Sequence, residues 1–381
     1  MKKLLLCCLA AVLLAACASD NVEPPAKLTN ILNPTLKVQE LWSRSISGNN
    51  AVMRLNLVPA SDGSSVYAAT NAGSVYALSL ADGSILWRTK TRLPLSAGPA
   101  VGSGMVVAAS NSGVVVALDP ASGKILWQTD LEGEILTVPA IGAGSVVVRT
   151  TDGRIVALSS DSGKQLWKSS FDVPRLILRG AGDPVIVDRT VYNGLNSGQL
   201  VALGMDDGKQ AWAATVGTPK GSNELARLAD VNGVLAVSGD EIFSAAYRGP
   251  VVALNRTSGQ VIWSRDISSY NGASADDNDV YVTDLNSAIW ALDRSNGAPI
   301  WTQPVLRARA ATVPVPFGSA VVVGDLQGYI HFISKKDGSL MDRERLGSDP
   351  ITAPPLVVGD VLLIQSNDGK IGAFKAQPTG G

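Results

Sequence analysis

The 381-residue sequence contains very little cysteine and histidine. Its three cysteines, Cys7, Cys8 and Cys17, all lie near the N-terminus, and His331 is its one histidine. The rest of the chain therefore has no thiol for a disulfide, a zinc site or a cysteine nucleophile. One histidine also excludes a multi-histidine metal site and allows a Ser-His-Asp triad only around His331. Because His331 lies in the strand-like stretch Tyr329–Phe332, we interpret it as a structural residue.

The chain also lacks an excess of basic residues. It has 32 lysines and arginines against 33 aspartates and glutamates, so its formal net charge is −1. Nucleic-acid-binding chains normally carry a basic surplus, which argues against nucleic acid as a partner. The hydrophobic fraction of 46% excludes a disordered chain, because disordered chains lack the apolar area that offsets ordering entropy. The composition indicates a globular protein.

The N-terminal residues have the pattern of a signal peptide. Lys2 and Lys3 precede the apolar run Leu4–Leu14, and small residues stand directly before Cys17. This pattern resembles a bacterial lipobox, which implies a signal peptide over residues 1–16 and a lipid on Cys17. An ordinary cleaved signal with an accidental cysteine is the alternative.

Residues 17–37 are rich in proline, asparagine and alanine, so we expect a lipidated, flexible tether. Acyl chains contribute about 0.8 kcal/mol per buried CH₂, and several chains together give stable anchoring. Ala18 follows Cys17, which by resemblance to sorted bacterial lipoproteins favours the outer membrane. No later stretch approaches the ~20 apolar residues of a spanning helix. The expected arrangement is a folded body attached to a membrane by lipid.

An internal repeat organises the remainder of the chain. Residues Gly73–Trp87 and Gly113–Trp127 share one frame, in which a Gly-x-x-x-Ala-Leu strand is followed by a glycine-containing turn and a tryptophan strand. Proline-containing stretches such as Val138–Ile141 precede the hairpins and supply two further strands. Periods of about 40–45 residues with four short strands indicate propeller blades. The frame starts eight times, at residues 73, 113, 153, 198, 249, 287, 328 and 369.

The two ends of the chain complete one blade. The eighth repeat begins at Gly369 and has no tryptophan strand, whereas Leu41–Trp42 is a tryptophan strand with no repeat before it. We therefore predict an all-β fold, an eight-bladed β-propeller of four-stranded antiparallel blades, closed by an N-terminal strand that joins the C-terminal blade. The predicted propeller spans residues 38–377, and residues 378–381 form a tail.

Seven of the eight tryptophans occupy the repeat position. A tryptophan side chain buries about 150–250 Å², so we predict that these residues lie between adjacent blades rather than in a substrate site. The seventh repeat has Asp342 at this position, and Trp290 stands outside the frame.

Two consecutive repeats are longer than most of the others after their tryptophan. The interval to the next repeat is 31 residues after Trp167 and 37 residues after Trp212, against 26 in the regular repeats. In the stretches 171–180 and 222–232, leucines alternate with arginines and acidic residues, a pattern that suits an apolar contact with a charged rim. Recognition in repeat proteins is usually carried by such insertions. A bulged loop that covers its own core is the alternative.

These features together resemble the BamB family of outer-membrane assembly lipoproteins. The motifs that carry the resemblance are the lipobox, the eight repeats, Pro-x-Leu-x-Leu-Arg-Gly at 174–180 and Glu-Leu-x-Arg-Leu-x-Asp-Val at 224–231. The resemblance implies a non-catalytic scaffold without a cofactor, on the periplasmic face of the outer membrane. It implies binding to the POTRA domains of BamA and, through BamA, to other BAM subunits. It also implies assistance to the folding and insertion of outer-membrane β-barrel proteins, whose unfolded chains are further candidate partners.

The candidate partner-binding residues follow from the same motifs. Leu176, Leu178 and Arg179 match the BamA-contact residues of the family, with Asp230 nearby, whereas Asn232 stands where the family often has a second acidic residue. The full candidate set is Arg175, Leu176, Leu178, Arg179, Glu224, Arg227 and Asp230.

Two other functions remain open at this point. The repeat also resembles that of PQQ-dependent dehydrogenases, but those enzymes are usually longer and commonly carry a vicinal disulfide beside the quinone and a calcium site. Here the adjacent cysteines Cys7 and Cys8 lie in the expected signal peptide, and no Cys-x-x-Cys-His haem site is present. A propeller scaffold of another envelope complex is the second alternative.

Overall fold

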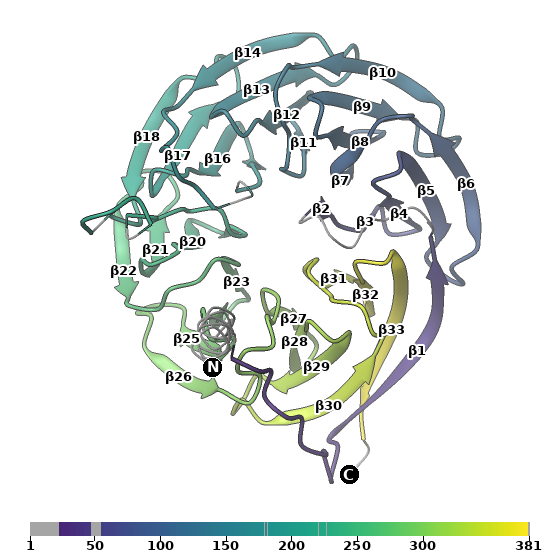
Figure 1. The fold of residues 1–381 in the computed structure, drawn as a ribbon, viewed down its shortest axis with the longest axis vertical. Helices are drawn as coiled ribbons and strands as arrows, with labels where there is room; N and C mark the ends of the chain where they lie inside the picture. The colour runs from purple at the N-terminus through teal and green to yellow at the C-terminus, as the bar shows by residue number, and fades with distance from the viewer. Residues whose placement is uncertain are drawn as a thin grey trace, which may run out of the picture.

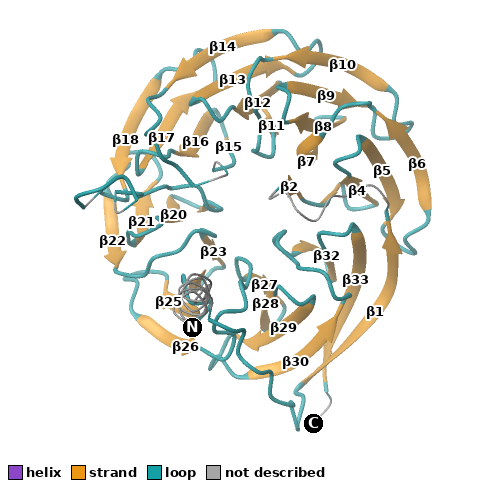
Figure 2. Cartoon of the chain, viewed as in Figure 1, coloured by secondary structure: helices purple, strands orange, loops and turns teal. Residues whose placement is uncertain are grey.

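The computed structural model describes residues 23–46, 55–178, 180, 182–219, 221–225 and 227–379. In these residues every regular element is a β-strand. Eight sheets stand around a central axis (Figure 1), and turns and loops connect them (Figure 2). No helix in the described ranges is long and apolar enough to cross a membrane. The predicted eight-bladed, all-β propeller is confirmed.

Seven blades consist of four consecutive antiparallel strands, and blade 8 takes its outermost strand from the N-terminus. Blade 1 contains β3 (Ala60–Ser61), β4 (Ser65–Ala69), β5 (Ser74–Ser79) and β6 (Ile85–Lys90), and blade 2 contains β7 (Leu95–Gly102), β8 (Met105–Ser110), β9 (Val114–Leu118) and β10 (Ile125–Asp130). Blade 3 contains β11 (Ala140–Gly142), β12 (Ser145–Arg149), β13 (Arg154–Ser159) and β14 (Gln165–Ser170), and blade 4 contains β15 (Val185–Val187), β16 (Thr190–Gly194), β17 (Gln199–Gly204) and β18 (Gln210–Thr215).

The remaining strands follow the same order from the axis outwards. Blade 5 contains β19 (Ala236–Ser238), β20 (Glu241–Ala245), β21 (Val251–Asn255) and β22 (Val261–Arg265), and blade 6 contains β23 (Ala273–Ala275), β24 (Asp279–Thr283), β25 (Ile289–Asp293) and β26 (Pro299–Gln303). Blade 7 contains β27 (Val315–Phe317), β28 (Ala320–Gly324), β29 (Tyr329–Ser334) and β30 (Leu340–Arg345), and blade 8 contains β31 (Leu356–Val358), β32 (Val361–Gln365), β33 (Lys370–Pro378) and β1 (Leu36–Ser45). In addition, β2 (Asn56–Leu57) pairs in parallel with β7 as a fifth strand of the blade 2 sheet.

The ring closes where the sequence predicts. Strand β1 runs antiparallel to β33, from the pair Leu36–Pro378 to the pair Ser45–Lys370. These outer pairs place the ends of the propeller at residues 36 and 378, slightly beyond the predicted limits of 38 and 377. The first and last strands of the chain thus form one continuous blade.

The two faces of the ring carry different connections. On one face the chain passes from the outermost strand of each blade to the innermost strand of the next. The opposite face carries the turns between the first and second strands and between the third and fourth strands of each blade. The first insert, residues 171–184, and the second insert, residues 216–235, both join an outermost to an innermost strand. We call the face on which they lie the insert face.

The repeat tryptophans join each blade to the next. Trp127 is 8% exposed, and its indole Nε1 donates a 2.7 Å hydrogen bond to the Ser160 carbonyl in the β13–β14 turn. In that turn Gly163 has φ +69°, and a Cβ on it would lie 2.6 Å from the indole Cε3, so only glycine fits. The predicted position between blades is confirmed. The other Nε1-to-carbonyl pairs are Trp42–Leu80, Trp87–Pro120, Trp167–Met205, Trp212–Arg256, Trp263–Arg294 and Trp301–Lys335.

Blade 7 lacks this tryptophan because blade 8 has no turn to receive it. The third and fourth strands of blade 8, β33 and β1, come from opposite ends of the chain. Asp342 occupies the tryptophan position of β30 and pairs with Phe332. Its Oδ2 accepts a 3.2 Å hydrogen bond from the backbone N–H of Val38 in β1. A short polar contact therefore replaces the indole at the junction of the two chain ends.

Residues 23–35, which we call the strap, lie against blade 7 instead of forming a free tether. Glu23 forms a 2.8 Å ion pair with Arg307, and the Ala26 N–H donates at 3.0 Å to the Arg307 carbonyl. Further along, the Thr35 N–H donates at 3.2 Å to the Met341 carbonyl at the start of β30. Because Arg307 lies in the β26–β27 connection, the strap begins at the insert face and crosses to the opposite face. Residues 17–22 of the expected tether lie outside the described residues.

Replacing Trp127 with alanine should lower the free energy of unfolding by about 3–5 kcal/mol, as for other buried aromatic side chains. The physical reason is the loss of the indole from the interface between blades 2 and 3, which also leaves the Ser160 carbonyl without its donor. Urea unfolding followed by circular dichroism measures the change. Trp127→Phe, which keeps most of the apolar area, should cost less. An unchanged midpoint in the alanine variant would contradict the role of the tryptophan.

Candidate functional site: the insert face

The two inserts flank blade 4 and contact each other. The first insert joins β14 to β15, and the second joins β18 to β19. The Leu178 N–H donates a long, 3.5 Å hydrogen bond to Asp230 Oδ2. Asn232 Nδ2 donates at 3.4 Å to the Gly180 carbonyl. The fold therefore brings together two segments that lie about fifty residues apart in the sequence.

The outer part of both inserts is exposed, and we call it the insert surface. Leu176 is 41% exposed, and the predicted residues Arg175, Glu224 and Arg227 are exposed as well. Leu225, which the sequence analysis did not select, is 58% exposed. The insert surface thus presents two leucines among charged side chains, in agreement with the expected apolar centre and charged rim.

Asp230 lies beneath this surface, because it is only 2% exposed. Its Oδ1 accepts hydrogen bonds from Asn196 Nδ2 at 2.7 Å and from Asn232 Nδ2 at 3.2 Å. Burial raises the pKa of Asp230 above its ordinary value. This residue therefore positions the first insert, through the Leu178 N–H, and does not itself offer a surface. Leu178 is half-buried, and Arg179 lies outside the described residues.

A buried arginine supports the same network. Arg149 is 1% exposed, and its guanidinium donates hydrogen bonds to the Gly194 carbonyl and to Asn196 Oδ1. Asn196 in turn donates to Asp230, so one amide links the cation to the carboxylate. Burial lowers the pKa of Arg149 to about 10, while the charges of Asp230 and Asp183 oppose this shift. Blades 3 and 4 are thus joined by a polar contact next to the inserts.

Arg149 was not among the residues predicted from the sequence, although the repeat contains a signal for it. Its strand position, the last of β12, is filled by alanine in three other blades, so an alignment of the repeats would have marked the arginine as an exception. These residues are Ala69, Ala109 and Ala245.

The second insert also covers part of the core, as the alternative interpretation expected. Leu228, Ala229 and Val231 are buried, and Val231 belongs to a core cluster with Tyr192 and Leu235. The insert therefore has a buried base and an exposed tip, and the two interpretations apply to different parts of it.

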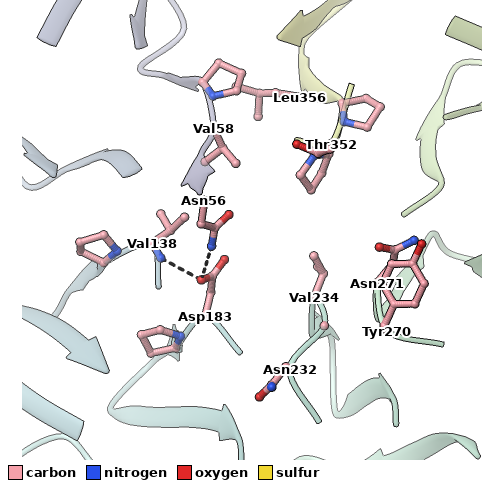
Figure 3. A pocket seen from close by; sticks show the side chains of 16 residues that line it. Asn56, Val58, Val138, Asp183, Asn232, Val234, Tyr270, Asn271, Thr352 and Leu356 are labelled. Carbon is pink, nitrogen blue, oxygen red and sulfur yellow. Dashed lines mark hydrogen bonds between the residues drawn. The ribbon is translucent and has the colours of Figure 1, made fainter. Parts of the chain in front are cut away.

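A cavity of about 370 Å³ lies on the propeller axis at the insert face (Figure 3). The segments that enter the innermost strands converge there. Asp183 Oδ1 accepts two 2.8 Å hydrogen bonds, from Asn56 Nδ2 and from the Val138 N–H. Burial raises the pKa of Asp183 to about 6, although its hydrogen bonds and the charge of Arg149 favour the ionised form. The axis thus presents a carboxylate that the sequence analysis did not select.

This cavity does not fit the cofactor of the quinoprotein dehydrogenases. Pyrroloquinoline quinone is a tricarboxylate and needs cationic or hydrogen-bond-donating partners. The described lining residues include the carboxylate of Asp183 and no lysine, arginine or histidine. We therefore derive no reaction step through such a cofactor.

His331 has a structural environment in blade 7. It is fully buried, and its Nε2 lies 2.9 Å from Asp325 Oδ2. Arg343 Nε donates to its Nδ1 at 3.2 Å, so the ring proton lies on Nε2 and is donated to Asp325. Burial lowers the pKa of His331, while Asp325 opposes this shift. Arg343 and Arg309 also donate to carbonyls of the strap. In the described ranges, no group of three or more histidine, cysteine and acidic side chains is placed to hold a metal ion.

Comparison with known proteins agrees with this architecture. A family model described as outer membrane protein assembly factor BamB matches residues 35–95, 71–303 and 297–379. The chain belongs to the BamB family. BamB of Pseudomonas aeruginosa is 43% identical over 366 residues, which cover 96% of each chain. BamB of Alkalilimnicola ehrlichii is 47% identical over 366 residues, covering 96% of this chain and 95% of the relative.

Solved structures show the same fold. BamB from Moraxella catarrhalis superposes with a TM-score of 0.82 at 25% identity, covering 89% of this chain and 100% of that one. A quinohemoprotein alcohol dehydrogenase from Comamonas testosteroni superposes with a TM-score of 0.70 at 14% identity, covering 89% and 76%. At that identity the comparison with the dehydrogenase is evidence of the propeller fold alone.

Replacing Asp230 with alanine should loosen the first insert in this BamB-family chain. The change removes the acceptor of the Leu178 N–H and of the buried Asn196 amide, at a cost of about 1–3 kcal/mol for each unsatisfied group. Amide hydrogen exchange of the purified variant should become faster in residues 171–180. Glu224→Ala, at an exposed position, is the control and should leave this exchange unchanged. Unchanged exchange in the Asp230 variant would contradict its positioning role.

Proposed function

We propose that this chain is a non-catalytic scaffold of the outer-membrane β-barrel assembly machinery. Its insert surface binds the POTRA domains of BamA, and through BamA it reaches the other BAM subunits and assists the folding and insertion of outer-membrane β-barrel proteins. A lipid on Cys17 holds it at the periplasmic face of the outer membrane. Unfolded outer-membrane proteins are additional candidate partners.

The observation that carries this proposal is the pairing of the two inserts on one face. Both inserts contain the family motifs, and hydrogen bonds from Leu178 to Asp230 and from Asn232 to Gly180 hold them together. Buried polar groups below fix the backbone, while Leu176 and Leu225 remain exposed above. Rigid support under exposed apolar side chains lowers the entropy cost of binding and is typical of protein interfaces.

A scaffold role also agrees with the chemistry of the described residues. The one histidine is buried among Asp325, Arg309 and Arg343, where it holds structural hydrogen bonds. The axial cavity presents a carboxylate, which does not suit an anionic cofactor such as pyrroloquinoline quinone. The family name of the relatives, assembly factor, points to the same class of function.

The double variant Leu176→Ala with Arg179→Ala should reduce BamA recovery in an affinity pull-down from solubilised membranes by about tenfold or more, because truncation of central interface residues typically costs over 1 kcal/mol. Its thermal unfolding should stay close to that of the unmodified chain, since Leu176 is exposed.

The matched control is Leu166→Ala with Arg189→Ala. Leu166 is 54% exposed in β14, and Arg189 lies in the β15–β16 turn on the opposite face, so BamA recovery should not change. A large loss of thermal stability in the first variant would indicate a structural role for these residues. Equal recovery with both variants would remove the support for the insert surface as the binding site.

The lipid attachment is tested separately. Cells fed with labelled palmitate should incorporate the label into the unmodified chain and not into the Cys17→Ala variant, because acylation needs the thiol of Cys17. The combined variant Cys7→Ala with Cys8→Ala should still be labelled. Label in the Cys17 variant would contradict lipidation at this residue.

A further inference from the structure

The axial cavity contains the carboxylate of Asp183, and only one of its two oxygens accepts hydrogen bonds from the described residues. Asp183 Oδ1 accepts two hydrogen bonds, from Asn56 Nδ2 and from the Val138 N–H. Its Oδ2 accepts none from the described part of the chain and points towards the open centre of the cavity (Figure 3). Asp183 itself is half-buried, so a ligand can reach it. The two bonds to Oδ1 hold the carboxylate in a fixed orientation.

The described walls of this cavity are poor in hydrogen-bond donors. Five of the lining residues are prolines, which have no backbone N–H. The side-chain amide of Asn56 already donates to Asp183, that of Asn271 donates to the Ala311 carbonyl at 2.8 Å, and that of Asn232 donates to Asp230 and Gly180. The described lining has no lysine, arginine or histidine. The cavity therefore offers acceptors to a guest and few donors.

The apolar lining residues indicate what kind of ligand the rest of the cavity would hold. Val58, Val138, Val234 and Leu356 line the cavity together with the proline rings, and Tyr270 lies on the side opposite Asp183 (Figure 3). These side chains suit an aliphatic stem, and an aromatic ring is a favourable neighbour for a cation. A volume of about 370 Å³ accommodates a chain of several methylene groups.

We propose that this cavity is a binding site for a primary alkylammonium group, held by Asp183 and enclosed by proline and aliphatic side chains. A charge-assisted hydrogen bond from the ammonium to Oδ2 would use the free oxygen and neutralise a carboxylate in an apolar environment. Two sources supply this chemistry, a free polyamine or a lysine side chain of a protein bound at the insert face. The second source rests on the proposed function, whereas the first does not.

The expected pH dependence follows from the electrostatics of the cavity. The charged group that acts on Asp183 is the buried guanidinium of Arg149, and the described lining of the cavity holds no other charged side chain. Burial raises the pKa of Asp183 to about 6. Because the ammonium needs the ionised carboxylate, affinity should be full above this value and fall as the pH drops through it.

The test uses the purified mature chain and small probes. Calorimetric titration with spermidine, and ligand-observed NMR with n-butylammonium and its uncharged counterpart 1-butanol, measure binding at pH 7.5 and pH 5. We expect both amines to bind more weakly at pH 5 and 1-butanol to bind weakly at either pH. Asp183→Asn should weaken spermidine binding at least tenfold. Asp349→Asn, a partly buried carboxylate on the same face outside the cavity, is the matched control and should have no effect.

A pull-down of BamA with the same two variants separates the two sources. If the small amines do not bind but Asp183→Asn alone lowers BamA recovery, a lysine of the partner is the guest and the proposal stands. If 1-butanol binds as well as n-butylammonium, or if neither the substitution nor the pH affects amine binding or BamA recovery, the proposal is wrong. If Asp183→Asn does not fold, the proposal is tested with the unmodified chain, by the pH dependence of amine binding and by the comparison of n-butylammonium with 1-butanol. The amine titrations need no partner, so their outcome is independent of the Leu176 and Arg179 experiment.

Discussion

The contact between a tryptophan and the glycine turn of the following blade is the constraint on which the ring depends. The indole needs a carbonyl for its N–H and a flat, Cβ-free surface for its ring, and the turn supplies both. Because these groups must meet at seven of the eight blade interfaces, the spacing from the first residue of the frame to the tryptophan is the same in each regular repeat. The connections on the insert face take no part in this contact and are therefore free to vary in length.

That freedom explains why the features with functional potential gather on one face. The two inserts, the axial cavity and the beginning of the strap all belong to segments that connect an outermost to an innermost strand or lie against one. Asp230 and Arg149 then convert the variable segments into fixed ones, through a network that begins on a regular strand of blade 3 and ends on the first insert. In repeat proteins the repeated framework is usually rigid, and the connecting segments vary and carry recognition.

The regular part of the molecule could be predicted from the sequence because it repeats. The eight repeat starts, seven of them glycine, the tryptophan spacing and the unpaired strand at Trp42 determine the number of blades and the closure. The absence of tryptophan at Asp342 also has a simple reason, the missing turn of blade 8. Even Trp290, outside the frame, has a local explanation, since its Nε1 donates to Asp284 Oδ2 at 3.0 Å.

What the sequence did not reveal depends on contacts between distant segments. Asp230 looked like a surface residue, because its burial arises from Asn196 and the first insert, neither of which is near it in sequence. Asp183 lies near the end of the first insert and precedes a proline, and only the convergence of six connections at the axis makes it part of the wall of a cavity. The strap has no periodicity, so its docking on Arg307 and Met341 could not be read from its composition.

The pairing of β1 with β33 has a consequence for how the protein is made. Residue 36 finds its partner at residue 378, so the loop that must close spans almost the entire polypeptide. Until β33 has been made, the edge of β1 has no partner strand and is open to pairing with other chains. A product that ends before β33 would be an open arc without its complementary strand.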